Sequence, residues 1–225
     1  MLSAIAIVPS APVMVPELAS AAAAELADLR EAVFAAAGSL PSRWIAIGVG
    51  PTDQVIGPVR AGTFAGYGVD VPVALSQDAT EVGELPLCAL VTGWLRGQVD
   101  PSASAEVHVL PGDLSDGSAL DRGRGLRAEI DDAGDPVGVL VVADGLHTLT
   151  PPAPGGYDPD SISVQEALDE ALAGGDVEAL ARVPRAVVGR VAYQALAGFG
   201  APRSAKELYR GAPYGVGYFA GVWHP

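Results

Sequence analysis

The sequence is poor in cysteine and histidine, and this scarcity limits its chemistry. Cys88 is the single cysteine, so no disulfide can form within the chain, and we expect a reducing, cytoplasmic location. One cysteine and three scattered histidines are too few for a structural zinc site. We therefore expect neither a disulfide scaffold nor a zinc module.

Basic residues are also scarce. Lysine and arginine number 13 against 27 acidic residues, which gives a formal net charge of −14. This negative charge repels nucleic-acid backbones and anionic membranes, so we expect neither as a partner. Six basic residues are concentrated after residue 181, where Glu207 is the single acid: Arg182, Arg185, Arg190, Arg203, Lys206 and Arg210. This segment predicts either a basic face that pairs with the acidic body or a local anion pocket.

The apolar N-terminal stretch lacks the basic residues of a signal peptide. Pro9, Pro12 and Pro16 also interrupt it well before the ~20 apolar residues that a membrane helix needs. We interpret it as a first strand that leads into a loop.

Strand-length apolar runs recur along the chain. They are nearly continuous rather than alternating, which is typical of strands covered on both faces. The runs are residues 3–8, 44–49, 71–75, 107–110 and 137–143, with a final strand expected within residues 211–223.

Helical segments are expected between these strands. They are residues 17–37, a helix starting near Ser163 and ending at Gly174, a short helix capped by Asp176, and residues 184–198 starting at Pro184. The Arg-Gly-Arg-Gly sequence at 122–125 predicts a loop or a helix interruption. The alternation predicts one domain over residues 1–225, an αβα three-layer sandwich with a largely parallel or mixed sheet.

Ligands of open α/β sheets bind beyond the carboxyl ends of the strands. We therefore expect the residues that follow three strands, 9–12, 48–51 and 144–147, to converge on one pocket. His147 is an acid/base candidate, because an imidazole exchanges protons at neutral pH and Asp144 could orient it. The alternative is a histidine that only hydrogen-bonds its Pro- and Gly-rich loop. His108 and His224 are expected to be structural or solvent-facing, and Cys88 to be a buried, inert thiol.

Three stretches also resemble a known family, the LigB-like class III extradiol ring-cleavage dioxygenases, a superfamily that includes the Memo proteins. "IVPSAPVMVPEL" resembles the family's N-terminal signature, and "ADGLHTLTPPAPGGYDP" resembles its central signature. "GAPYGVGYFAGVW" is similar to its closing strand. The matches lie at the start, middle and end of the chain, and the middle one is the most specific.

The resemblance implies an αβα domain in which two histidines and a glutamate hold a non-haem Fe(II), while a further histidine transfers protons. The two histidines fall on Ser10 and on Val49 or Gly50, and the glutamate falls on Arg190. None of these side chains is an ordinary Fe(II) ligand, and arginine repels the cation. The proton-transfer position, His147, is retained together with Asp144.

We therefore expect a domain without metal or cofactor that binds a small anionic or aromatic ligand in the ancestral pocket. His147 and Asp144 are its catalytic candidates. The ligand-binding candidates are Ser10, Gly50, Arg190 and Tyr157. Arg190 either holds an anionic group of the ligand or pairs with Asp144 or another acid to fill the vacated site.

Three alternatives stay open. One is a metal-independent enzyme that uses His147 as general acid/base in hydrolysis, isomerisation or decarboxylation. A second is ring cleavage at an unorthodox metal site. The third is a Memo-like interaction module, which predicts an occluded pocket, an internally salt-bridged Arg190 and an apolar patch elsewhere on the surface. A homodimer is also expected, with residues 216–223 as an edge strand.

Overall fold

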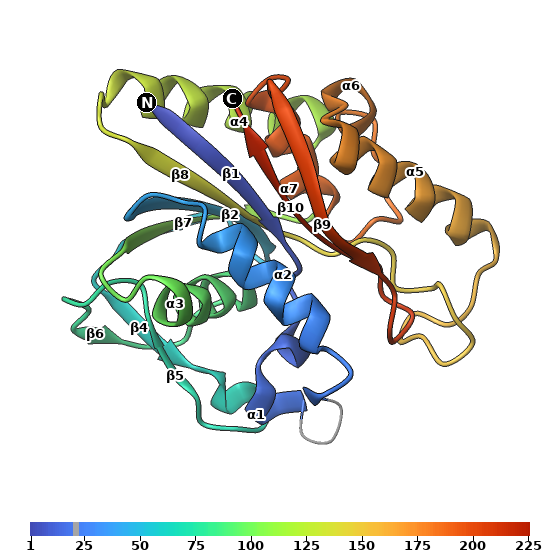
Figure 1. The fold of residues 1–225 in the computed structure, drawn as a ribbon, viewed down its shortest axis with the longest axis horizontal. Coiled ribbons are helices and arrows are strands. Elements are labelled where there is room, and N and C mark those ends of the chain that lie inside the picture. Colours follow the sequence, from blue (N-terminus) through green and yellow to red (C-terminus); the bar gives the residue numbers. More distant parts are fainter. Residues whose placement is uncertain (20–22) are drawn as a thin grey trace.

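The computed structural model describes residues 1–19 and 23–225, and its centre is a seven-stranded mixed sheet (Figure 1). The strand order is β3-β7-β2-β8-β1-β10-β9. Neighbouring strands β7, β2, β8 and β1 are parallel, whereas β3, β10 and β9 pair antiparallel. The strands are β1 (Leu2–Val8), β2 (Arg43–Gly50), β3 (Gln54–Ile56), β7 (Ser104–Pro111), β8 (Val137–Val142), β9 (Ser204–Gly211) and β10 (Tyr218–His224).

Helices cover both faces of this sheet, which confirms the predicted three-layer sandwich (Figure 1). Helices α2 (Ala27–Ala37) and α3 (Leu87–Val99) cover one face. The other face carries α4 (Asp116–Asp132), α5 (Asp160–Gly174), α6 (Val177–Leu180) and α7 (Arg190–Gly198). Within the described residues, no helix is both long and apolar enough to span a membrane.

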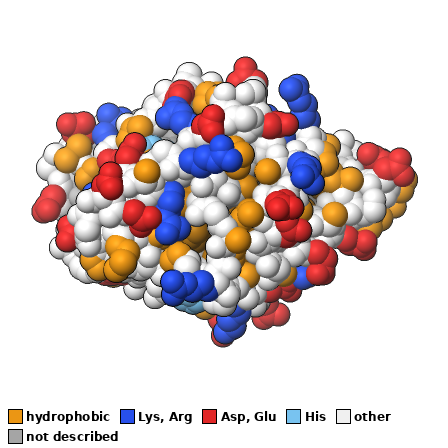
Figure 2. All heavy atoms as spheres, turned by 90° about the horizontal axis from the view of Figure 1, so that it is seen from above, with side chains coloured by type: hydrophobic (Ala, Val, Ile, Leu, Met, Phe, Trp, Pro, Cys, Tyr) orange, Lys and Arg blue, Asp and Glu red, His pale blue; other side chains and the backbone are white. Residues whose placement is uncertain are grey.

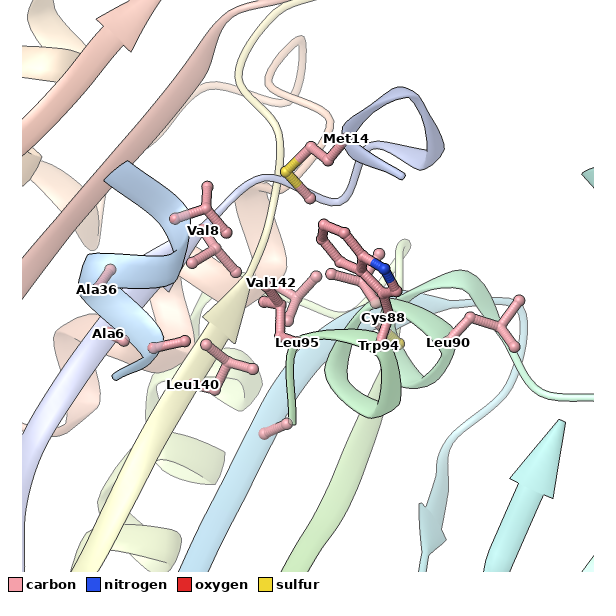
Figure 3. Packing of buried hydrophobic residues seen from close by; sticks show 14 of the residues in the cluster. Ala6, Val8, Met14, Ala36, Cys88, Leu90, Trp94, Leu95, Leu140 and Val142 are labelled. Atoms are coloured by element: carbon pink, nitrogen blue, oxygen red, sulfur yellow. The ribbon is translucent and has the colours of Figure 1, made fainter. Parts of the chain in front are cut away.

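Alternate residues of the central strands enter two separate cores. In β1, Ala6 and Val8 pack under α2 and α3, whereas Ile5 and Ile7 pack on the opposite side. Figure 3 shows the first of these cores, to which Met14, Trp94 and Leu140 belong. Because both faces are buried, both sets of side chains are apolar, which accounts for the continuous runs in the sequence.

The apolar run 71–75 is an exception, because it does not join the central sheet. It contributes β5 (Pro72–Ala74) to a small sheet with β4 (Arg60–Thr63) and β6 (Glu81–Val82), in the order β5-β4-β6. Val73 is buried while Pro72 is exposed, so this strand is covered on one face rather than on both. The expectation of a strand covered on both faces is wrong here.

The helix predicted for residues 17–37 is interrupted. A short helix α1 (Pro16–Ala19) precedes it, residues 23–26 form turns, and α2 begins at Ala27. Residues 20–22 lie outside the described part of the chain. The Arg30 guanidinium donates to the Ala23 carbonyl, which holds the turn against the first part of α2.

Two further helix starts differ from the prediction, and one agrees with it. Helix α5 begins at Asp160, and the Ser163 hydroxyl donates to the Asp160 carbonyl instead of capping the helix. The helix expected from Pro184 begins only at Arg190, because the amides of residues 188 and 189 donate to the loop after β8 instead of continuing a helix. Asp176 caps α6 as predicted, accepting from two backbone amides.

The Arg-Gly-Arg-Gly sequence lies inside α4, so the predicted interruption is wrong. A β-carbon at Gly123 would overlap the Ala195 carbonyl of α7, and one at Gly198 would overlap the Leu120 carbonyl of α4. The glycines therefore allow two helix backbones to touch. They do not break the helix.

The expected edge strand is also wrong. Residues 218–224 form β10, which lies between β1 and β9, so its backbone is paired on both sides. The edge on this side is β9, which carries the charged residues Lys206, Glu207 and Arg210. Charged side chains on an edge disfavour pairing with a second sheet.

Charges of both signs are scattered over the surface seen in Figure 2, with small apolar patches between them. Two arginines of the basic C-terminal segment pair with acids of the body, Arg190 with Asp116 and Arg210 with Glu170, and Arg210 also pairs with Glu207 of its own segment. These pairs agree with a basic face that pairs with the acidic body, and not with a collected anion pocket.

Candidate functional site at the carboxyl ends of the strands

Three of the sequence-predicted residues lie side by side at the carboxyl edge of the sheet. Val142 of β8 is in register with β2 on one side and β1 on the other. Two residues beyond this row lie Gly50, Asp144 and Ser10, one from each strand. The Ser10 amide donates a 2.8 Å hydrogen bond to Asp144 Oδ1. The register of three parallel strands therefore brings these positions together.

Asp144 is only partly exposed, and its carboxyl group is perturbed. Burial raises its pKa to about 7, and the hydrogen bond from the Ser10 amide lowers it in part. Burial also raises the pKa of Tyr193 and Tyr218, and the Asp144 carboxylate adds to both effects. A carboxyl group with a pKa near neutrality is suited to both accept and release a proton.

The hydroxyl of Tyr193 is already engaged below this carboxylate. It donates a 3.0 Å hydrogen bond to the Ala143 carbonyl from a fully buried position in α7. Tyr193 therefore anchors the residue that follows β8, and its buried phenol is not free to act on a ligand.

The loop after β8 is held by Gln165 of α5. Its side-chain oxygen accepts from the Leu146 amide at 2.8 Å, and its nitrogen donates to Asp169 at 2.8 Å. A β-carbon at Gly145 or Gly217 would overlap this side chain. Two glycines from distant parts of the sequence therefore make room for one buried amide, which locks two loops against α5.

The same loop is also paired with the turn before β10. The Gly145 amide donates to the Gly217 carbonyl at 2.8 Å, and the Gly217 amide donates to the Leu146 carbonyl at 2.7 Å. The Leu149 amide donates to the Gly215 carbonyl at 3.1 Å. The central and closing sequence signatures are thus one hydrogen-bonded unit in space.

His147 lies at the surface of this unit. Its backbone carbonyl accepts from the Gly155 amide at 2.9 Å, but its exposed imidazole forms no hydrogen bond with any described residue. Asp144 has Ser10 as its partner and is not hydrogen-bonded to the His147 ring. Tyr157 is half exposed on the same loop, with 50% of its surface accessible. His147 and Tyr157 are thus solvent-facing.

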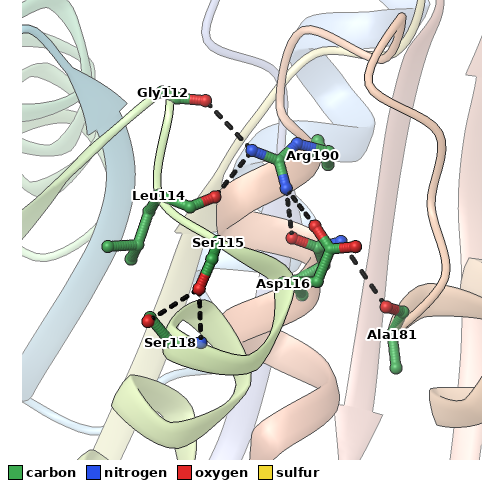
Figure 4. A network of polar contacts seen from close by, with 8 residues as sticks. Gly112, Leu114, Ser115, Asp116, Ser118, Ala181 and Arg190 are labelled. Atoms are coloured by element: carbon green, nitrogen blue, oxygen red, sulfur yellow. Dashed lines mark hydrogen bonds and ion pairs between the residues drawn. The ribbon is translucent and has the colours of Figure 1, made fainter.

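Arg190 is enclosed by protein groups (Figure 4). Only 5% of it is exposed, and its guanidinium forms an ion pair with Asp116 at 2.5 Å. The same group donates to Gln194 and to two backbone carbonyls of the β7–α4 loop, those of Gly112 and Leu114. Of the two roles open to Arg190, the structure gives it pairing with an acid, and that acid is Asp116 rather than Asp144.

The residues on which the resemblance places iron ligands do not fit Fe(II). Ser10 offers a neutral hydroxyl, Val49 or Gly50 offers an apolar side chain or none, and Arg190 is a buried cation. A β-carbon at Gly50 would overlap the Val109 side chain, so this position has no room for an imidazole. Among the described residues, no group of three or more His, Cys, Asp or Glu side chains is arranged to hold a metal.

Two cavities in the described part of the chain lie away from this edge. One of about 530 Å³ lies between α3 and the small sheet, and one of about 290 Å³ lies between α5 and α6. Neither is lined by Ser10, Asp144, His147 or Arg190.

Sequence reasoning did not identify Gln165 or Asp116. Gln165 has a weak signal in the sequence, because the glycines that accommodate it both lie in family-like stretches. Asp116 has none, since its partner is 74 residues away.

No family model matches the chain, and no curated protein matches it. The fold is similar to the crystal structure of an uncharacterized protein, JW3007, from Escherichia coli K12. The TM-score is 0.53 at 12% sequence identity, and the alignment covers 98% of this chain and 99% of that one. At this identity the likeness concerns the fold alone.

Proposed function

We propose that this chain is a LigB-like domain that has lost its iron centre and acts as a non-catalytic, Memo-like interaction module. The order of the three family-like stretches supports the family. The αβα sandwich and the meeting of the first two stretches at the Ser10–Asp144 hydrogen bond agree with it. The single cysteine supports a cytoplasmic location.

The observation that carries the proposal is the state of Arg190. The resemblance assigns its position to a metal ligand, and its donors are taken by Asp116, Gln194 and two carbonyls. A buried cation repels Fe(II), and a guanidinium with its donors occupied offers little to an anionic ligand. Both ring cleavage and anion capture are therefore disfavoured at this position.

A second observation favours an interaction role. Five large apolar residues exposed to solvent belong to one segment, residues 55–82: Val55, Val59, Tyr67, Val69 and Val82. Exposed apolar residues that form one contiguous patch are typical of a contact surface, and these five residues share one stretch of the chain. An internally paired Arg190 and exposed apolar residues away from the strand ends are two of the three features that the interaction-module hypothesis predicts, and an occluded pocket is the third.

The test is elemental analysis of protein prepared anaerobically with added iron, together with native mass spectrometry and an oxygen-uptake assay with a catechol. We expect no stoichiometric iron, no oxygen uptake and no retained small anion. Stoichiometric iron with oxygen uptake would overturn the proposal. A retained anion displaced in an Arg190→Met variant would show that the arginine binds a ligand after all.

Asp144 supports a second candidate, a metal-independent enzyme that works by acid/base catalysis. Its pKa of about 7 is the value that such a group needs near neutral pH. Hydrolysis of p-nitrophenyl esters by the wild type, Asp144→Asn and His147→Ala tests it. A working site should lose about 10²–10⁴ in rate in Asp144→Asn. Equal rates in all three proteins would remove this candidate.

A further inference from the structure

The cavity of about 530 Å³ lies far along the sequence from the family-like loops at residues 144–159 and 211–223. It is formed by the C-terminal half of α3 and by the hairpin of β4 and β5, with Glu17 of α1 also in its lining. Figure 1 shows α3 beside β4 and β5, in the part of the molecule that also contains α1. Its volume is in the range of small-molecule sites, which is roughly 300–1,000 Å³.

Two glycines of α3 shape this cavity in different ways. A β-carbon at Gly93 would lie 3.2 Å from the Ala74 carbonyl, so this glycine permits close contact with β5. A β-carbon at Gly97, one turn further on, would meet nothing within 4 Å. The missing side chain at Gly97 therefore leaves space beside an apolar wall that includes Val73 and Trp94.

Two of the charged residues that line the cavity are acidic and form no ion pair with the described part of the chain. Glu17 and Asp70 are both exposed, and within the described residues neither forms an ion pair. Asp70 accepts a hydrogen bond from the Thr63 hydroxyl, which fixes one carboxylate oxygen. Its remaining acceptor sites are open to a ligand.

Arg96 also lines the cavity, but its guanidinium is engaged. It donates to three backbone carbonyls, those of Ala74, Pro101 and Ala103. These bonds leave few donors for an anionic ligand. Two carboxylates outside any ion pair among the described residues therefore face one guanidinium whose donors are mostly taken by neutral carbonyls, and this net negative lining favours a positively charged guest, as does the net charge of −14.

We propose that this cavity binds a small organic cation, with an apolar body against Val73 and Trp94 and a primary ammonium group directed to Asp70 and Glu17. The inference does not rest on the proposed function, because the cavity shares no residue with the strand-end site. The ammonium donates to carboxylate oxygens, and the apolar body replaces water on the cavity wall.

A matched pair of probes tests both parts of the site. 2-Phenylethylamine and 3-phenylpropionate have nearly the same apolar body and opposite charges. In ¹H–¹⁵N correlation spectra of the full chain, the amine should shift the Gly62, Gly93 and Gly97 amides and saturate in the millimolar range. The carboxylate should bind about tenfold more weakly or not at all. Equal binding of both probes, or no shift at these three glycines, would overturn the proposal.

Two variants complete the test. A β-carbon at Gly97 meets nothing within 4 Å, so Gly97→Leu should place a side chain at the cavity lining, abolish amine binding and leave the melting temperature unchanged or higher. Gly125→Leu in α4 is its matched control, because a β-carbon there also meets nothing within 4 Å. Asp70→Asn should weaken the amine about three- to tenfold and should strengthen the carboxylate, because the same charge that attracts one probe repels the other. Wild-type amine affinity in a folded Gly97→Leu protein would exclude this cavity as the site.

Discussion

The Ser10 amide and the Asp144 carboxylate form a 2.8 Å hydrogen bond between the ends of two neighbouring parallel strands, although 134 residues separate them in sequence. This contact joins the first family-like stretch to the second. It also fixes a partly buried acid at the edge where ligands of such sheets bind.

Replacing Asp144 by asparagine should make stability less sensitive to pH. The folded pKa is about 7, above the unfolded value of about 3.9, so the folded state binds more protons between these values. Wild-type stability should therefore fall as pH rises through this window. Asparagine can still accept from Ser10, so Asp144→Asn should gain on the order of 1–3 kcal/mol at pH 8 and little at pH 4.

Urea unfolding of both proteins across this pH range measures the difference. Asp169, whose pKa is raised to about 6 chiefly by burial, should leave a smaller slope of the same sign in the variant. A gain that is the same at both ends of the range would show that the Asp144 carboxyl is not perturbed.

Arg190 and its partner Asp116 should differ in their contributions to stability. Arg190→Met leaves two carbonyls and the Gln194 oxygen without a donor, and should cost about 2–4 kcal/mol. The Asp116 side chain is 64% exposed, so Asp116→Asn should cost less than about 1 kcal/mol. Denaturant unfolding of the two variants measures both values. Equal losses would mean that the ion pair, and not the carbonyl contacts, makes the main contribution.

Cys88 should be unreactive in the native protein. Burial raises the pKa of its thiol to about 12, so almost no thiolate is present at pH 8. A disulfide reagent such as dithionitrobenzoate should label it slowly in buffer and at once in denaturant, as followed by absorbance. Rapid, complete labelling of folded protein would contradict the burial of α3 against the sheet.

Gln165 should control the mobility of the loop after β8. Gln165→Leu loses its bonds to the Leu146 amide and to Asp169, and should cost about 2–3 kcal/mol. Hydrogen exchange at the Leu146 and Gly217 amides should become faster. Glu166→Gln, an exposed neighbour on α5, is the control and should leave this exchange unchanged. Unaltered exchange in Gln165→Leu would show that the backbone pairing alone holds the loop.

The central strands could be predicted because burial on both faces leaves a plain trace in the sequence. Residues 3–8, 44–49, 107–110 and 137–143 all lie within strands of the central sheet or reach one residue beyond. The row of Ser10, Gly50 and Asp144 followed from them, since parallel strands end at one edge. The prediction for residues 71–75 was wrong because a short apolar strand that is covered on one face has the same sequence pattern as a strand that is buried on both faces.

The remaining differences come from contacts between distant segments. Pro184 is a good first residue for a helix, but the loop after β8 takes the amides of residues 188 and 189. The family-like final stretch suggests an edge strand, yet β9 pairs with it from outside. The guanidinium of Arg190 lies against the loop before α4, and no local spacing could indicate that partner.

At the contact between Gly123 and the Ala195 carbonyl, the backbones of α4 and α7 approach each other without room for a β-carbon. Two helices whose backbones touch cannot slide or tilt independently without collision. The N-terminus of α4 carries the loop after β7, and the segment before α7 is bonded to the loop after β8. A movement that opens the carboxyl edge of the sheet must therefore displace the loops after β7 and β8 together. A partner that binds either loop and moves it would also move the other.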